Sequence, residues 1–171
     1  MIMKVKVFCT IVFFALTTSG FGQESVIWNK WSTLIGEWEG EGNGQTGQGD
    51  GIFSFTFDLD EKIIVRKSHS EYPANGDKPK ITHDDLMIIY LEMTGTPSRA
   101  IYFDNEGHMI NYSISYTEKS IILLSNNIGD APIFRLTYIF LDNETIDTKF
   151  EMSQDGEQFI MYVEGKSKKV K

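Results

Sequence analysis

Apolar and polar residues alternate along most of the chain, and this period of two predicts β-strands. The clearest case is segment 53–57, where Phe53, Phe55 and Phe57 fall on one face and small polar residues on the other. Turn-forming residues such as Asn105-Glu106-Gly107 separate the alternating segments. The pattern predicts about ten strands, which cover residues 37–42, 53–57, 63–72, 81–92, 99–104, 108–117, 119–126, 133–142, 145–153 and 157–166.

A helical period occurs just before these segments. Ser25 can cap a helix, and the apolar residues after it fall three and four positions apart at Ile27, Trp31, Leu34 and Ile35. One short helix cannot supply the crossovers that parallel strands need, so we expect an all-β fold, a single antiparallel up-and-down barrel. Closure of such a meander removes edge strands and leaves an interior wide enough for a ligand. A sandwich of two sheets is the alternative.

Residues 1–22 have the features of a secretory signal peptide. The basic residues Lys4 and Lys6 precede a short apolar stretch, which ends in small and polar residues. We expect cleavage next to Gln23 and export to a periplasm or to the exterior of the cell. Cys9 lies within the apolar stretch, so the mature chain would contain no cysteine and no disulfide. A retained membrane anchor is the alternative for this segment.

The length and composition fit one domain, with 171 residues of which 41% are hydrophobic. We expect residues 23–166 to form the barrel and the basic residues 167–171 to be a solvated tail. The formal net charge of -8 disfavours a nucleic acid or an anionic membrane as the partner. The chain lacks a phosphate-binding loop, a Gly-x-Ser-x-Gly motif and a His-Glu-x-x-His motif. The sequence therefore favours a protein that is not an enzyme, without deciding the question.

A short motif at the expected junction of helix and first strand reads Trp31-x-x-Leu34-x-Gly36-x-Trp38-x-Gly40-x-Gly42. It resembles the calycin barrels, which comprise the lipocalins, the fatty-acid-binding proteins and the nitrobindin-like haem barrels. Segments 65–73, 83–90 and 102–108 further resemble a group of secreted bacterial proteins without an assigned activity. The resemblance implies a calycin-like barrel in which Trp38 plugs the closed end.

Two features of the calycin families bear on the ligand and on the last strand. Nitrobindin-like proteins hold haem through a late histidine, whereas this chain has no histidine after His108, so we predict no haem and no other cofactor. Lipocalins often set an arginine of the last strand over the tryptophan. The resemblance implies that Lys166 or Lys168 takes that place here.

Polar residues gather where an odd-numbered strand ends and the next even-numbered strand begins. In an up-and-down meander these positions lie at one rim, so we expect all three histidines of the chain to lie at the same mouth. The predicted polar cluster at the mouth consists of His69, Glu71, His83, Asp85 and Asp104, with His108 beside it. A solvated lip, a role in orienting a ligand, and metal or acid–base chemistry are all open for this cluster, and we assign no metal.

Strand parity predicts which side chains face the interior. We expect the ligand to be bound by Phe55, Phe57, Arg99, Phe103, His108, Tyr112, Phe134 and Tyr138. Arg99 shares its face with Ile101 and Phe103, so it is expected to point inward, where it could bind a carboxylate. Arg135 has the opposite parity to Phe134 and is expected to face solvent if that aromatic row faces inward. A barrel packed solid by these side chains is the alternative.

The sequence thus favours an exported protein that binds a small apolar or amphipathic molecule inside a barrel without catalysis. An enzyme that uses His69, Glu71, His83 and His108 at the mouth is one alternative. A packed domain that contacts another exported protein is the other.

Overall fold

The computed structural model describes residues 28–42, 51–72, 74, 79–93, 95–126, 129 and 131–170. The predicted signal peptide, its cleavage point at Gln23 and Cys9 lie outside the described residues. Within them a short helix precedes ten strands, namely α2 (Asn29–Leu34), β1 (Gly36–Gly40), β2 (Ile52–Asp58), β3 (Ile63–Tyr72), β4 (Ile81–Leu91), β5 (Pro97–Asp104), β6 (Met109–Tyr116), β7 (Ser120–Ser125), β8 (Ile133–Phe140), β9 (Thr145–Ser153) and β10 (Ile160–Lys169).

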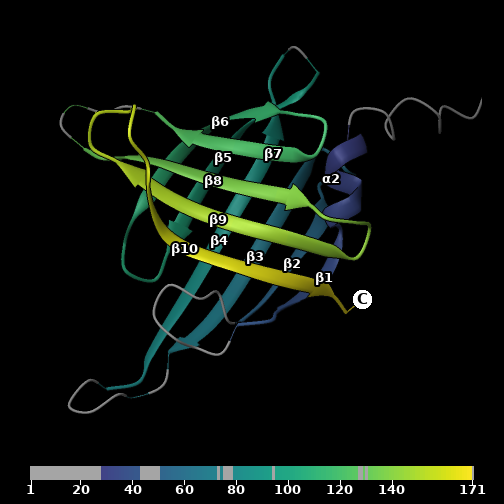
Figure 1. Ribbon diagram of the computed structural model, residues 1–171. Coiled ribbons are helices and arrows are strands. Elements are labelled where there is room, and N and C mark those ends of the chain that lie inside the picture. Colours follow the sequence, from purple (N-terminus) through teal and green to yellow (C-terminus); the bar gives the residue numbers. More distant parts are fainter. Residues whose placement is uncertain are drawn as a thin grey trace, which may run out of the picture.

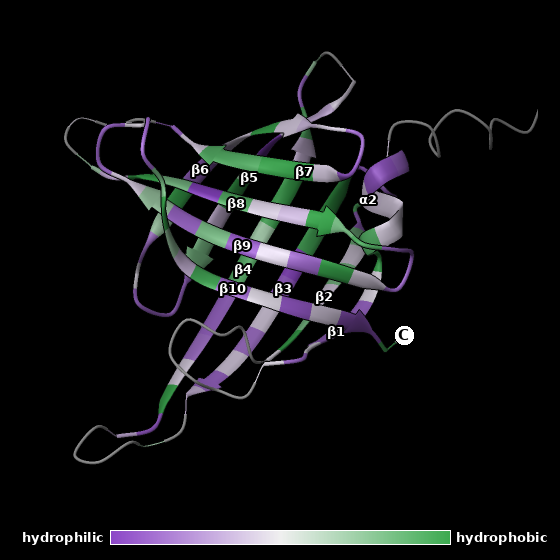
Figure 2. Ribbon diagram, viewed as in Figure 1, coloured by the Kyte–Doolittle hydropathy of each residue, from purple (hydrophilic) through white to green (hydrophobic). Residues whose placement is uncertain are grey.

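The strands form a closed barrel. Each strand pairs antiparallel with the next one along the chain, and β10 pairs with β1 through Trp38 opposite Lys169, which closes the ring (Figure 1). The predicted antiparallel up-and-down barrel of about ten strands is therefore confirmed, and the two-sheet alternative is wrong. Bands of hydrophobic and hydrophilic residues alternate along β8 and β9 in Figure 2, as expected for strands with one face inside.

One end of the barrel is closed by α2, and we call it the closed end. Three tryptophan side chains are buried there, and each indole N–H donates to an oxygen, so that none is buried unpaired. Trp28 donates to the Glu61 carbonyl at 2.9 Å, Trp31 to the Tyr116 hydroxyl at 2.9 Å, and Trp38 to the Leu34 carbonyl at 2.7 Å. Among the described residues, no helix has the length and apolar character needed to cross a membrane.

The core fills the interior on the side of the closed end. Phe55 is fully buried, and its ring lies 5.6 Å from that of Tyr138, edge to face. These residues come from β2 and β8, so the contact bridges the barrel. Trp38 stacks on Phe53 at 6.2 Å, and Trp31 lies 6.1 Å from Phe55. Contacts of this kind contribute about 0.5–1.5 kcal/mol each beyond the burial of area.

The last strand extends further than the sequence predicted. Residues 167–169, which we expected in a solvated tail, belong to β10, and Ser167 is 4% exposed. The Lys169 ammonium lies 5.5 Å from the Trp38 ring and donates to the Thr33 carbonyl at 3.0 Å. Lys169 thus takes the place expected for Lys166 or Lys168. The cause is a β-bulge near the start of β10, which changes which residues face inward.

Candidate functional site at the open end

The end opposite α2, which we call the open end, carries the histidines. His69 lies in register with Asp84, Ser70 with His83, and the Asp104 N–H donates to the His108 carbonyl. The prediction that all three histidines lie at one rim is confirmed. The sheet nevertheless separates their side chains into two groups, one outside the barrel and one inside.

The outer group consists of His69, Glu71, Asp84 and Lys80. Residues of β3 with even numbers, such as the fully buried Ile64, face inward, so His69 and Glu71 point outward. The His69 Nδ1 lies 2.6 Å from Asp84, its Nε2 lies 3.6 Å from Glu71, and Lys80 lies 2.8 Å from Glu71. The hydrogen bond with Asp84 raises the pKa of His69. The side chains of His69 and Glu71 are 44% and 51% exposed, so the predicted single cluster at the mouth is wrong for these two residues.

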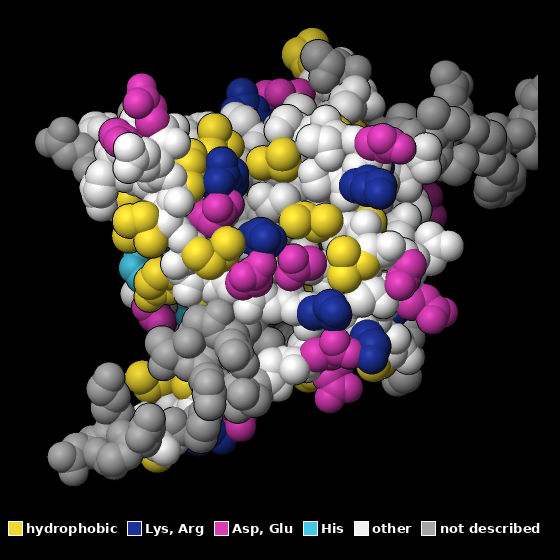
Figure 3. Space-filling model, in the orientation of Figure 1, with side chains coloured by type: hydrophobic (Ala, Val, Ile, Leu, Met, Phe, Trp, Pro, Cys, Tyr) yellow, Lys and Arg dark blue, Asp and Glu magenta, His cyan; other side chains and the backbone are white. Residues whose placement is uncertain are grey.

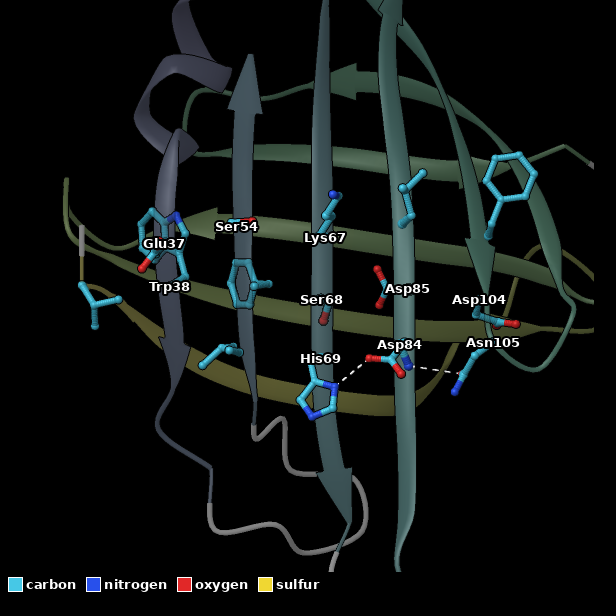
Figure 4. A pocket seen from close by; sticks show the side chains of 15 residues that line it. Glu37, Trp38, Ser54, Lys67, Ser68, His69, Asp84, Asp85, Asp104 and Asn105 are labelled. Atoms are coloured by element: carbon cyan, nitrogen blue, oxygen red, sulfur yellow. Dashed lines mark hydrogen bonds and ion pairs between the residues drawn. The ribbon is translucent and has the colours of Figure 1, made fainter. Parts of the chain in front are cut away.

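A hollow of about 760 Å³ runs across the outer wall formed by β1 to β5 (Figure 4), and we call it the outer groove. Ile52, Leu86 and Phe103 are among its apolar lining residues, and His69 and Asp84 among the polar ones. Its lining also includes five residues whose side chains belong to the inner faces, namely Trp38, Phe53, Ser68, Asp85 and Asp104. Phe103 is 38% exposed, so its predicted place in the interior is wrong.

The inner group begins with an ion pair between Arg66 of β3 and Asp85 of β4. Their side chains are 12% and 7% exposed. Burial works against the charge of Arg66, but the Asp85 carboxylate holds the pKa of Arg66 above its usual value. The Arg66 guanidinium also lies 5.3 Å from the Phe53 ring centroid. Arg66, rather than Arg99, is the arginine that points into the barrel.

A hydrogen-bonded chain continues from this pair to the rim. The His83 Nε2 lies 3.9 Å from Asp85 and 3.0 Å from the Tyr102 hydroxyl. The Tyr102 hydroxyl donates to Asp104 at 3.4 Å, and Asp104 lies 2.8 Å from the His108 Nδ1. Burial, together with the carboxylates of Asp85 and Asp104, raises the pKa of Tyr102, so this hydroxyl stays protonated. The predicted shared face of His83 and Asp85 is confirmed.

Asp104 and His108 form the outer end of this chain. Burial disfavours the Asp104 carboxylate, but hydrogen bonds from the backbone and ring of His108 outweigh it and lower the pKa of Asp104. The hydrogen bond between the His108 ring and the Asp104 carboxylate raises the pKa of His108. The His108 side chain is 62% exposed, so its predicted inward position is wrong. It precedes β6 and turns back to Asp104 at the rim.

The predicted inward orientation of Arg99 is also wrong. Its Nε donates to Glu92 at 3.2 Å and its Nη1 donates to the Ser113 hydroxyl at 2.6 Å on the outer face. The neighbouring Ala100 is 1% exposed, which shows that β5 turns its even-numbered residues inward. Arg135 does face outward as predicted, where it forms hydrogen bonds of 2.7 and 2.8 Å with Glu151. Figure 3 shows that acidic, basic and apolar side chains are interspersed on this face, formed by β7 to β10.

The remaining predicted ligand-binding residues lie in the barrel. Their interior position is confirmed, and their role in ligand binding stays a prediction, for Phe55, Phe57, Tyr112, Phe134 and Tyr138. Phe134 stacks on Phe150 with ring centroids 5.6 Å apart and planes at 11°. These two rings lie nearer the open end than Tyr138 does, since β8 begins at that end.

Three buried polar atoms on the inner faces have no hydrogen-bond partner among the described residues. They are the Arg66 Nε, the Tyr138 hydroxyl and the Thr148 Oγ1. Tyr138 and Thr148 lie opposite each other on β8 and β9, while Arg66 lies on β3. Five pairings separate β3 from β8 in either direction around the ring, so the two strands face each other. Burial raises the pKa of Tyr138 to about 12.

No protein-family model and no curated protein matches this chain. Among the described residues, no group of three or more histidine, cysteine, aspartate or glutamate side chains could hold a metal ion. The inner faces carry hydrogen-bonded side chains, such as His83 with Tyr102, and the ion pair of Arg66 with Asp85.

Proposed function

We propose that the protein is an exported calycin-like barrel that binds a small apolar or amphipathic molecule in its interior, entered from the open end. The observation that carries this proposal is the hydrogen-bonded chain from His83 through Tyr102 to Asp104, which lies on the inner faces and reaches the rim of the open end.

The buried ion pair supports the same conclusion. Desolvation of Arg66 and Asp85 offsets much or all of their mutual attraction, and apolar residues of similar volume often give equal or greater stability. A barrel that served only as a packed structural domain would gain by replacing both residues. A polar group of a bound ligand would interact with these side chains, which accounts for their place in the interior better than packing does.

The apolar part of a ligand would contact the aromatic rings near the open end. Phe134 and Phe150 provide flat apolar surface, and Met152 lies in register with Phe134. Methionine side chains adapt to irregular shapes, which suits a site for small molecules. The calycin-like identity and the export are supported by the motif around Trp38, the lysine set over that ring, and the predicted leader.

The proposal is tested by native mass spectrometry of the mature protein recovered from its export route. We expect a bound mass that is lost on denaturation. Uptake of the neutral fluorescent probe N-phenyl-1-naphthylamine is then measured on two matched variants, Phe134→Leu inside the barrel and Phe103→Leu on the outer face. The inner change should weaken uptake and the outer change should not. Absence of both a bound mass and probe uptake would contradict the proposal.

A further inference from the structure

We propose that the outer groove is a second binding site, which takes an amphipathic molecule with one anionic group and an apolar chain or ring system. The site lies outside the barrel, so this inference goes beyond the proposed function and does not depend on it. Three observations carry it, namely the shape of the outer groove, a row of apolar side chains at one end of it, and a lysine beside that row.

Two neighbouring rows of outward side chains line the outer groove, and both run across the strands (Figure 4). Cross-strand register gives the first row as Ser54, Lys67, Leu86 and Phe103, and the second as Ile52, His69 and Asp84. Neighbouring strands lie about 4.8 Å apart, so the row from β2 to β5 is about 14 Å long. The volume of about 760 Å³ lies within the range of about 300–1,000 Å³ that is usual for small-molecule sites. The groove therefore suits an elongated small molecule that lies across the strands.

The first row is apolar where it crosses β4 and β5, and it continues onto β6. Leu86 lies in register with Phe103, and Phe103 with Met109. Phe103 and Met109 are 38% and 59% exposed. Side chains directly opposite each other on neighbouring strands lie about 5 Å apart, so these three form one continuous apolar surface. Contiguous exposed apolar surface beside a hollow is typical of a binding site.

Lys67 supplies a positive charge beside this apolar surface. It is exposed and lies directly opposite Leu86. Among the described residues, Lys67 forms neither a hydrogen bond nor an ion pair. The other charged side chains of the two rows, His69 and Asp84, bond to each other at 2.6 Å, and Glu37 of β1 is separated from Lys67 by β2. An unpaired ammonium next to apolar surface complements an anionic amphiphile, whether its charge belongs to a carboxylate, a sulfonate or a phosphate.

The distance between the lysine and the aromatic ring limits the size of the ligand. Lys67 on β3 and Phe103 on β5 are two strand spacings apart, which is about 10 Å. With the anionic group at the Lys67 ammonium, a chain of about eight to ten carbon atoms or a system of two to three rings covers Leu86 and Phe103. The groove therefore selects medium-sized anionic amphiphiles.

Two fluorescent probes test the charge requirement on the mature protein. The anionic probe 8-anilinonaphthalene-1-sulfonate is N-phenyl-1-naphthylamine with an added sulfonate group. We expect Lys67→Gln to weaken binding of the anionic probe about three- to tenfold, because the ammonium is lost, and to leave uptake of the neutral probe unchanged. Lys67→Arg keeps the charge and should keep the affinity. Lys119→Gln is the matched control, since Lys119 is exposed in the turn between β6 and β7 at the closed end.

The apolar part of the site is tested with Phe103→Ala. This change should weaken binding of the anionic probe about fivefold, because it removes the ring on which the apolar part of the probe lies. Equal binding of the anionic probe by wild type, Lys67→Gln and Phe103→Ala, or no binding at all, would overturn the inference while the proposed function stands. Failure to take up the neutral probe, with anionic binding that still depends on Lys67 and Phe103, would overturn the proposed function alone.

A second copy of the chain is the other occupant that would cover this apolar surface. Sedimentation velocity of wild type and Phe103→Ala distinguishes the two occupants, and we expect both proteins to be monomers. A wild-type dimer that Phe103→Ala dissociates would assign the surface to an interface between copies and would overturn the inference.

Discussion

The closed and open ends of the barrel bury polar groups in opposite ways. At the closed end every tryptophan N–H has an oxygen partner, and the rings of Trp31, Trp38 and Phe55 pack against their neighbours. Toward the open end lie a buried ion pair and a chain of titratable side chains that reaches the rim. We therefore assign the stability of the fold mainly to the closed end and the proposed binding to the open end. Substitutions at the two ends should therefore change different properties of the protein.

The largest effect is expected at the closed end. Trp38→Ala removes a fully buried ring that stacks on Phe53, and it should lower the free energy of unfolding by about 3–5 kcal/mol. Urea denaturation measures the loss. Phe103→Ala is the control, because this ring is 38% exposed on the outer wall and should cost much less. Equal losses would show that the closed end is not the main source of stability.

The next effect distinguishes the buried charges from ordinary packing. Asp85→Ala leaves the Arg66 charge buried and unpaired, and should cost about 3 kcal/mol. The double variant Arg66→Met with Asp85→Leu should recover most of this loss, because it removes both desolvation costs. Chemical denaturation of the single and double variants gives the comparison. A double variant as unstable as the single one would mean that the ion pair stabilises the fold.

A smaller effect is expected where the last strand meets the helix. Lys169→Ala removes the hydrogen bond to the Thr33 carbonyl and the contact with the Trp38 ring, and should cost about 1–2 kcal/mol. Lys168→Ala is the matched control, since Lys168 pairs with Glu41 in solvent and its side chain is 64% exposed. Thermal unfolding of the two variants should show a lower melting temperature for Lys169→Ala alone.

The smallest effect is a pH dependence at the rim of the open end. The folded-state pKa of His108 is raised by Asp104 above its usual value of 6.5. The stability that His108 contributes to the fold is therefore fully present below pH 6.5, and it is lost as the pH rises through the raised pKa. The pKa of Asp104 is lowered in the folded protein, so the stability that its carboxylate contributes is lost only in acid. The loss takes place as the pH falls below 3.8, the usual pKa of this group. Melting temperatures of wild type and His108→Gln should converge as the pH rises, and parallel curves would contradict this assignment.

The barrel was predictable because the same pattern of alternating strands and short turns recurs along the chain. Every strand alternates, short turns separate the strands, and only one helical segment is long enough to recognise. The interior face of β8 was predictable as well. Phe134 and Tyr138 alternate there with Arg135 and Thr137, so only one face is apolar.

The site was harder to predict because β3 and β5 are apolar on both faces. Ile63 and Val65 face outward although the inward Ile64 is equally apolar, so the pattern gave no reason to place Arg66 inside. On β5, Ile101 and Phe103 form the more apolar face and yet lie outside. Cross-strand register with β4 and β6 decides the orientation, and that information is not local in the sequence.

The pairing of β1 with β10 has a consequence for the order of folding. The Lys169 ammonium reaches the Thr33 carbonyl across 136 positions of sequence, and Trp38 pairs with Lys169. During synthesis the first strand must therefore wait for nearly the whole chain before its second edge is covered. Long-range closure of this kind slows folding, because loop entropy is lost before the contacts form. Until β10 arrives, the nascent sheet exposes two edges on which another chain could pair.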